Sequence, residues 1–189
     1  MTLPFAEKEV EYIQRLFVKK SSSVIVIMNP TRKKALSELR SHTIVHFACH
    51  GYSANDPSKS SLLLNDGHIT VSDLISLDID SAKFTFLSAC HTSATRDFGL
   101  LDESITLSSA IQLCGYPSVV GSLWQIGDKH SMEVARDVYA WILEGDSGGF
   151  DAERSAEGLH KAVRNLRQRT RVRKKHDPLT WAPFIHIGV

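Results

Sequence analysis

Short apolar runs rich in β-branched residues alternate with amphipathic stretches along this chain, and no other feature constrains the fold as strongly. Runs of about four to eight such residues predict strands, while apolar residues at every third or fourth position predict helices. Strands and helices that alternate in this way form a parallel sheet whose faces the helices cover. The sequence therefore predicts an α/β fold, a mostly parallel sheet with helices on both faces.

The expected elements follow one another from residue 4 to the end of the chain. Strands are predicted at Ser23–Met28, Thr43–Cys49, Lys83–Ala89 and Ser118–Trp124, in a hairpin around Asn65, Asp66 and Gly67, and in the closing stretch TWAPFIHIGV. Helices are predicted at residues 4–19, Thr31–Leu39, Ser72–Leu77, Asp102–Cys114, Lys129–Leu143 and Ala152–Arg169. Gly115 is expected to end the helix before it, because glycine favours the position that follows a helix.

Length and cysteine content narrow the class of protein. The chain has 189 residues, 42% of them hydrophobic, which is enough to bury a core as a single domain over residues 1–189. Its three cysteines, Cys49, Cys90 and Cys114, are far apart and form no CxxC motif. An odd and scattered set argues against a disulfide framework and against a zinc ribbon. A reducing, cytoplasmic compartment is therefore expected.

Charge and hydropathy argue against two kinds of partner. The N-terminal stretch MTLPFAEKEVEYIQRLF has acids inside its apolar part, so neither a signal peptide nor a membrane span is expected. The net charge of +1 gives no general case for nucleic-acid binding. Residues 161–175 nevertheless contain eight basic residues and no acid. This run is either the solvated end of a helix, whose cations suit the negative helix terminus, or a surface for RNA or an acidic partner.

Two of the predicted core strands end in a reactive side chain. The run IVHFAC leads to His50 and Gly51, and the run FTFLSA leads to Cys90. Residues that follow neighbouring parallel strands converge at the carboxyl edge of the sheet, where ligands bind in α/β proteins. A thiol and an imidazole placed there can act as nucleophile and base, and the Gly51 amide can face a developing oxyanion. Both side chains are also common as packing groups, so the residues alone do not decide between a catalytic pair and packing roles.

The remaining thiols and imidazoles have simpler interpretations. Cys49 falls inside a core strand and Cys114 inside an amphipathic helix, so packing roles are expected for both. A zinc site built from His42, His46 and His50 is disfavoured, because residues four apart on a strand lie about 13 Å from one another. No metal and no cofactor are expected.

Four stretches resemble the CHAT family, caspase-like domains that are often attached to tetratricopeptide repeats and are related to separase, gingipains and caspases. They are HFACHG at His46–Gly51, LSACHT at Leu87–Thr92, the long stretch from Leu100 to Asp128, and the closing PLTWAPFIHIG. The resemblance covers about Ser41–Val189, so residues 1–40 lie outside it. It implies a caspase-like domain at the C-terminal end of a longer protein.

The resemblance implies a regulated cysteine endopeptidase that cuts protein or peptide substrates. By position, His50 is the general base and Cys90 the nucleophile that forms a thioester, with the Gly51 amide holding the oxyanion. Repeat domains or partner proteins are the regulatory partners it implies. Because fold does not fix function, a catalytically silent scaffold that binds a partner through the same fold is the alternative.

Substrate recognition is expected at Asp128, Trp124 and Asp97. In the related separases, the segment similar to LWQIGD carries acids that favour a basic side chain before the scissile bond. Asp128 is equally well explained as the cap of the helix that begins at Lys129, and Trp124 as a core residue. The sequence departs from related ones at His91, where glutamine often follows the nucleophile.

Overall fold

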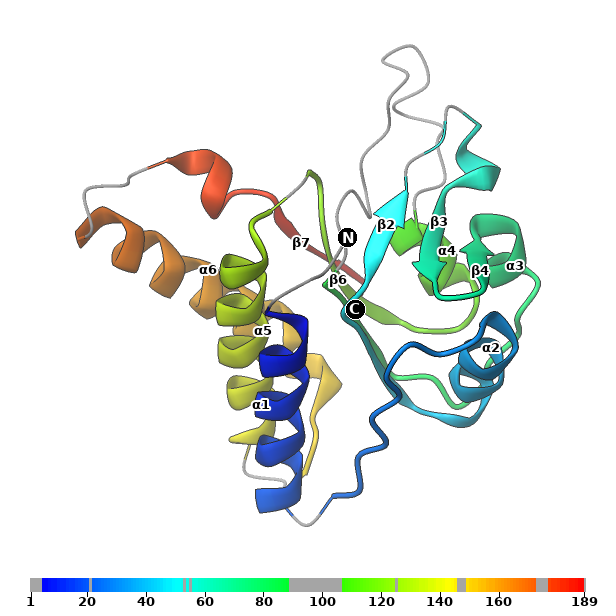
Figure 1. Cartoon of the computed structure of the whole chain (residues 1–189). Coiled ribbons are helices and arrows are strands. Elements are labelled where there is room, and N and C mark those ends of the chain that lie inside the picture. Colours follow the sequence, from blue (N-terminus) through cyan, green and yellow to red (C-terminus); the bar gives the residue numbers. More distant parts are fainter. Residues whose placement is uncertain are drawn as a thin grey trace. The chain divides into compact units, whose positions relative to one another are not determined.

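The computed structural model describes residues 5–20, 22–52, 54, 56–88, 107–124, 126–145, 149–172 and 177–188. The chain forms two compact units, each built from discontinuous segments (Figure 1). We call residues 27–125 with 187–189 the sheet unit, and residues 1–26 with 126–186 the helical unit.

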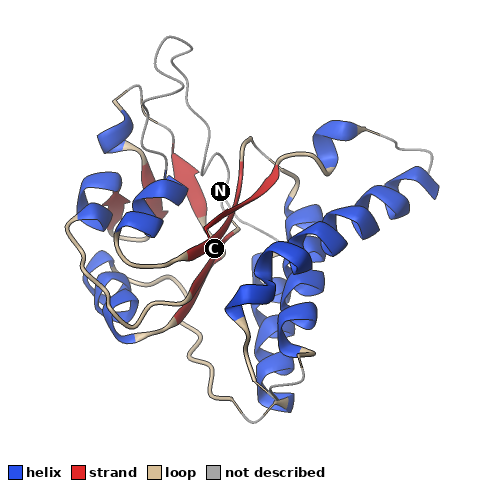
Figure 2. Cartoon of the chain, turned by 180° about the vertical axis from the view of Figure 1, so that it is seen from behind, coloured by secondary structure: helices blue, strands red, loops and turns tan. Residues whose placement is uncertain are grey.

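The sheet unit contains the predicted parallel sheet. Its strand order is β1-β5-β6-β7, and the last residues of β7 belong to this unit. Strand β5 pairs in parallel with both β1 and β6. The strands are β1 (Ile44–Phe47), β5 (Phe84–Leu87), β6 (Ser118–Ser122) and β7 (Phe184–Gly188). Figure 2 shows these strands and the helices beside them, and the predicted α/β class, a mostly parallel sheet flanked by helices, is confirmed.

A second, antiparallel sheet lies in the same unit. Its order is β2-β3-β4, with β2 (His50–Tyr52), β3 (Ser61–Leu64) and β4 (Gly67–Thr70). The hairpin predicted around Asn65 and Asp66 is therefore present, as β3 and β4. The short strand β2 was not predicted. It follows β1 after only two residues and pairs with β3.

The described residues of the sheet unit also form the helices α2 (Arg32–Ser41), α3 (Val71–Ile75) and α4 (Leu107–Leu113) and a 3₁₀ turn at Pro57–Lys59. The predicted start of α4 near Asp102 lies outside the described residues. Gly115 follows α4 with φ +123°, and a Cβ there would collide with the carbonyl oxygen of Ile79. Glycine is therefore required at this predicted helix stop. The hydrophobic core of these elements includes the fully buried side chains of Leu39, Leu62, Ile69, Leu74 and Ile111.

The described residues of the helical unit form helices, their connections and the first three residues of β7. The helices are α1 (Ala6–Lys19), α5 (Asp128–Leu143), α6 (Ser155–Val172) and two 3₁₀ turns at Ala152–Arg154 and Pro178–Thr180. Phe17 of α1 meets Tyr139 of α5 edge to face, with ring centroids 5.8 Å apart. Helix α6 approaches α5 at Gly158, where a Cβ would lie 3.2 Å from Trp141 Cδ1. None of the described helices combines the length and apolar character that a membrane crossing requires.

The predicted strand at Ser23–Met28 is wrong. Residues 22–27 have no regular secondary structure, and the side chains of Ile25 and Met28 are 63% and 57% exposed. β-branched residues favour a strand only where a neighbouring strand and a packed face receive them. Residues 23–28 have the composition of a strand, but they pair with none of the described strands.

Candidate functional site

Three parallel strands of the sheet unit bring their carboxyl ends to one edge. His46 on β1 is paired with Phe86 on β5, and Phe86 is paired with Val120 on β6. Counting four residues onward from this row reaches three predicted site residues. They are His50, Cys90 and Trp124.

The structure describes only part of this predicted set. His50, Gly51 and Trp124 belong to the described part of the sheet unit, whereas Cys90 and Asp97 lie outside the described residues. Strand β5 ends at Leu87, and the backbone N–H of the next residue, Ser88, donates to the Phe47 carbonyl oxygen at 2.8 Å. The chain therefore leaves the sheet beside the end of β1 two residues before Cys90.

His50 is held differently from the prediction. Strand β1 ends at Phe47, and His50 begins β2, where it is the cross-strand partner of Leu63 while Gly51 is the partner of Leu62. Both His50 and Gly51 are half-buried. Because β2 is at the edge of its sheet, alternate backbone groups of this strand point away from β3. The candidate base is thus anchored by an antiparallel sheet as well as by the end of a parallel strand.

An arginine outside the predicted set ties this antiparallel sheet to α2. The Arg32 backbone N–H donates to Asp66 Oδ1 at 2.7 Å, and its Nε donates to the His68 carbonyl oxygen at 3.0 Å. Its Nη2 donates to Asp73 Oδ1 at 2.6 Å. The backbone of Arg32 therefore binds the β3–β4 turn, and its side chain joins α2 to β4 and α3. No motif in the sequence marks Arg32, since its partners are 34 to 41 residues away.

Asp73 also closes the first turn of α3. Its Oδ2 accepts from the Thr70 backbone N–H at 2.9 Å, and Thr70 Oγ1 accepts from the Asp73 N–H at 3.1 Å, which is a capping box. Burial alone raises the pKa of Asp73, but the hydrogen bonds from Thr70 and Arg32 outweigh it and leave the pKa below its ordinary value. The T-x-x-D spacing is a signal that the sequence does contain.

The two described thiols differ in environment. Cys114 is fully buried, its Sγ donates to the Ile111 carbonyl oxygen at 3.1 Å, and burial raises the pKa of this thiol to about 11. Its predicted packing role is confirmed. Cys49 follows β1 instead of lying inside it, and it is half-buried against the core. A protonated, buried thiol is a poor nucleophile, which agrees with a packing role for Cys114.

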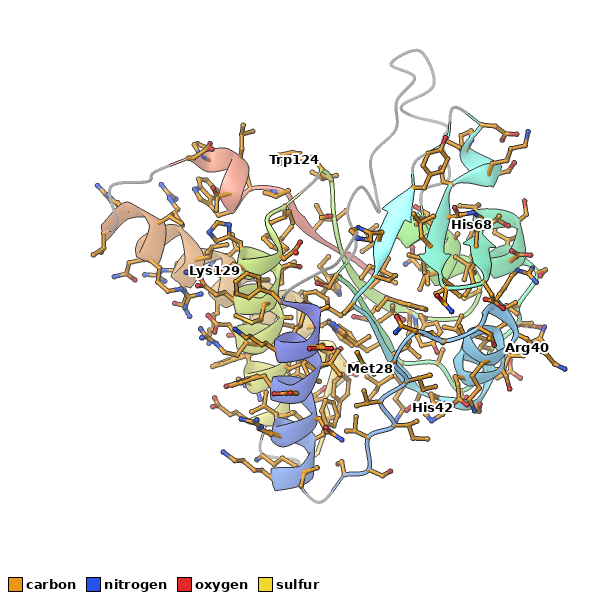
Figure 3. All side chains as sticks on the ribbon, in the orientation of Figure 1. Met28, Arg40, His42, His68, Trp124 and Lys129 are labelled. Carbon is orange, nitrogen blue, oxygen red and sulfur yellow. The ribbon has the colours of Figure 1, made fainter. Side chains whose placement is uncertain are left out.

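Trp124 and Asp128 belong to different units. Trp124 follows β6 by two residues and is half-buried in the sheet unit (Figure 3). Asp128 is the first residue of α5 in the helical unit, and Gly127 is the N-cap. The predicted capping role of Asp128 is therefore wrong by one position. Its carboxylate still lies in the first turn, where negative charge is favourable.

Within the described ranges, no three His, Cys, Asp or Glu side chains gather closely enough to hold a metal ion.

Comparisons with known proteins agree on the fold. The complex of Porphyromonas gingivalis RgpB pro- and mature domains is similar with a TM-score of 0.67 at 12% identity, covering 95% of this chain and 41% of that one. The crystal structure of the Arg specific cysteine proteinase gingipain R (RgpB) is similar with a TM-score of 0.64 at 12% identity, covering 96% and 41%. The chain thus has the fold of caspase-like cysteine peptidases and spans 41% of the length of these two matches.

Sequence comparison identifies the family. None of the curated proteins matches the chain. The family model described as the CHAT domain matches residues 1–189, and so includes the first 40 residues that the resemblance had left out. The chain therefore belongs to the CHAT domain family.

Proposed function

We propose that the chain is a cysteine-type endopeptidase in which Cys90 is the nucleophile and His50 the general base. The observation that carries the proposal is the strand register. His50 and Cys90 stand four residues beyond His46 and Phe86, which are paired partners on adjacent parallel strands. Membership of the CHAT family and the fold of caspase-like cysteine peptidases support the same conclusion.

The proposed reaction has two steps. The Cys90 sulfur attacks the carbonyl carbon of a peptide bond as its proton passes to His50, and the Gly51 amide holds the oxyanion. The C–N bond breaks, the amine leaves with the proton from His50, and a thioester remains on Cys90. Water then attacks the thioester with His50 as base, which releases the acid and restores the thiol. A reducing intracellular compartment suits this chemistry, because it keeps the thiol free.

We further propose a preference for a basic side chain before the scissile bond. Asp128 supplies the negative charge, and Trp124 and Asp97 are the other proposed recognition residues. The similar gingipain is described as Arg specific, which supports the same preference here. Regulation is by a partner protein in this proposal. The complex of RgpB with its pro-domain is a parallel for such a partner.

The test is covalent labelling with a chloromethyl ketone peptide that ends in arginine. Wild-type protein is expected to take up one label, located on Cys90 by mass spectrometry, and Cys90→Ala is expected to take up none. Cys49→Ala is the matched control, since Cys49 is the partly exposed thiol among the described residues, and it should label normally. Equal labelling of Cys90→Ala would overturn the assignment.

The same reagent tests the base. His50→Gln is expected to slow labelling about 100-fold or more, because general-base assistance contributes about 10²- to 10⁴-fold. His68→Gln is the control, since His68 lies on β4 in the same cross-strand row, with Leu63 between it and His50. His68 is exposed (Figure 3). If both variants labelled at the wild-type rate, His50 would not be the base.

A further inference from the structure

Helix α6 of the helical unit has one buried face and one exposed face. Its buried residues recur every three or four positions. They are Ser155, Gly158, Leu159, Ala162, Leu166 and Thr170. This spacing places them on one side of the helix, so the residues between them face solvent.

Two basic residues of α6 are used inside the unit. Arg169 Nη1 lies 3.0 Å from Asp137 Oδ2, and its Nε lies 3.4 Å from Glu133 Oε2. The Lys161 ammonium lies 3.0 Å from Glu157 Oε1 and 3.0 Å from the centre of the Trp141 ring. These two cations stabilise the packing of the unit and are not available to a partner.

Three other arginines form an exposed row that we call the arginine stripe: Arg164, Arg167 and Arg171. Together with exposed His160 they are spaced by four, three and four residues, so they share one face of α6. That face is opposite the buried residues, and Figure 3 shows nitrogen-tipped side chains projecting from this helix.

The arginine stripe has no acidic partner among the described residues. The salt bridges of α6 involve Lys161 and Arg169, and none involves Arg164, Arg167 or Arg171. The sequence has no acid between Glu157 and Asp177. Three guanidinium groups therefore stand along about 10 Å of helix without local neutralisation, at a rise of 1.5 Å per residue.

One member of the stripe is held in place. The Arg167 guanidinium lies over the Trp181 ring, 5.0 Å from its centre. A cation–π contact of this kind orders the side chain without neutralising its charge. Less rotamer entropy is then lost when an anion binds, which favours binding.

We infer that the arginine stripe is a docking surface for an acidic segment of a partner protein. Guanidinium groups bind carboxylates in a bidentate manner, and an acidic segment with charges at helical or strand spacing can match a row of this pitch. Nucleic acid fits less well, because the whole chain carries a net charge of only +1 and so lacks the broad positive field that binds a phosphate backbone. The inference does not depend on catalysis by Cys90.

Binding is tested with the full chain and a fluorescent peptide of ten glutamates, followed by anisotropy in about 50 to 200 mM salt. The variant is Arg164→Gln with Arg171→Gln, because neither arginine has a partner whose loss would disturb the fold. The matched control is Lys19→Gln with Lys129→Gln, two exposed lysines of the same unit, which removes the same charge from elsewhere. Both variants should unfold at the wild-type temperature.

The stripe variant is expected to bind the peptide about three- to tenfold more weakly than wild type, and the control variant to bind it normally. Equal weakening in both variants would mean that only overall charge matters and would overturn the inference. So would absence of peptide binding by the wild type. A single-stranded RNA of ten phosphates that bound more tightly than the peptide would assign the surface to nucleic acid instead.

Discussion

At the residue scale, the carboxylate of Asp73 has more structural consequence than its position on the surface suggests. It accepts hydrogen bonds from Thr70 and from Arg32, and these link α3 to the end of β4 and to α2. Since β2 pairs with β3 and β3 with β4, the position of His50 depends on this cluster. Asp73 is thus a positioning residue that acts on His50 indirectly, through strands β4, β3 and β2.

The lowered pKa of Asp73 makes the stability of the fold depend on pH. A carboxyl group with a lower pKa in the folded state than in the unfolded state stabilises the fold above its unfolded pKa, near 4. This stabilisation is lost as pH falls through the folded pKa. We expect Asp73→Asn to lower the free energy of unfolding at pH 7 by about 1 to 2 kcal/mol.

Urea unfolding at several pH values measures this effect. The difference between wild type and Asp73→Asn should shrink as pH falls from 5 towards 3, since protonation removes the same charge. Asp78→Asn is the control, with no hydrogen bond among those described for its side chain, and it should match wild type throughout. A difference that stayed constant with pH would show that the charge of Asp73 is unimportant.

Some residues of the site are predictable from sequence and others are not. His50 follows a recognisable apolar strand, and the thiol of Cys114 was correctly assigned to packing, because local pattern decides both. Asp128 was misassigned by one position because helix boundaries are weakly coded, and Gly127 is the N-cap. Arg32 was missed because its role depends on contacts between segments far apart in the sequence.

At the element scale, residues 23–28 and strand β6 have similar compositions and different structures. Val119 on β6 is fully buried, whereas Ile25 is 63% exposed in a segment without regular structure. Local preference for a strand is stronger in residues 23–28, which hold four β-branched residues where β6 holds two. The structure depends instead on the presence of a neighbouring strand, and this is not a property of the segment itself. The same reasoning explains why β2, with the unremarkable sequence HGY, was missed.

This difference predicts the effect of introducing a hydroxyl. Ile25→Thr should change the free energy of unfolding by less than about 0.5 kcal/mol, as surface substitutions usually do. Val119→Thr should cost about 1 to 3 kcal/mol, because it buries a hydroxyl in an apolar core. Thermal or urea unfolding compares the two. If Ile25→Thr were as costly as Val119→Thr, residues 23–28 would be a packed strand after all.

At the scale of the whole molecule, the chain passes between its two units three times, after Val26, Gln125 and His186. The alternation of strands and helices predicts the α/β class but not this division, since it depends on which segments pack together. The proposed base His50 belongs to the sheet unit, and the proposed specificity residue Asp128 belongs to the helical unit. Chemistry and substrate preference are then assigned to different units.

This separation predicts distinct kinetic effects. Asp128→Asn should raise KM about tenfold or more for a peptide with arginine before the scissile bond, because a charge-assisted hydrogen bond is lost, while kcat changes little. Glu144→Gln is a matched control, since Glu144 is an exposed acid at the other end of α5. An unchanged KM in Asp128→Asn would remove Asp128 from substrate recognition.

The row formed by His46, Phe86 and Val120 has a consequence for length variation. In each of the three strands a proposed site residue stands four positions after this row, so its place depends on the number of residues between. Inserting or deleting a single residue at Ala48 would shift His50 along β2 and turn its side chain to the opposite face. The connection between β1 and β2 is therefore fixed in length although it has no regular secondary structure.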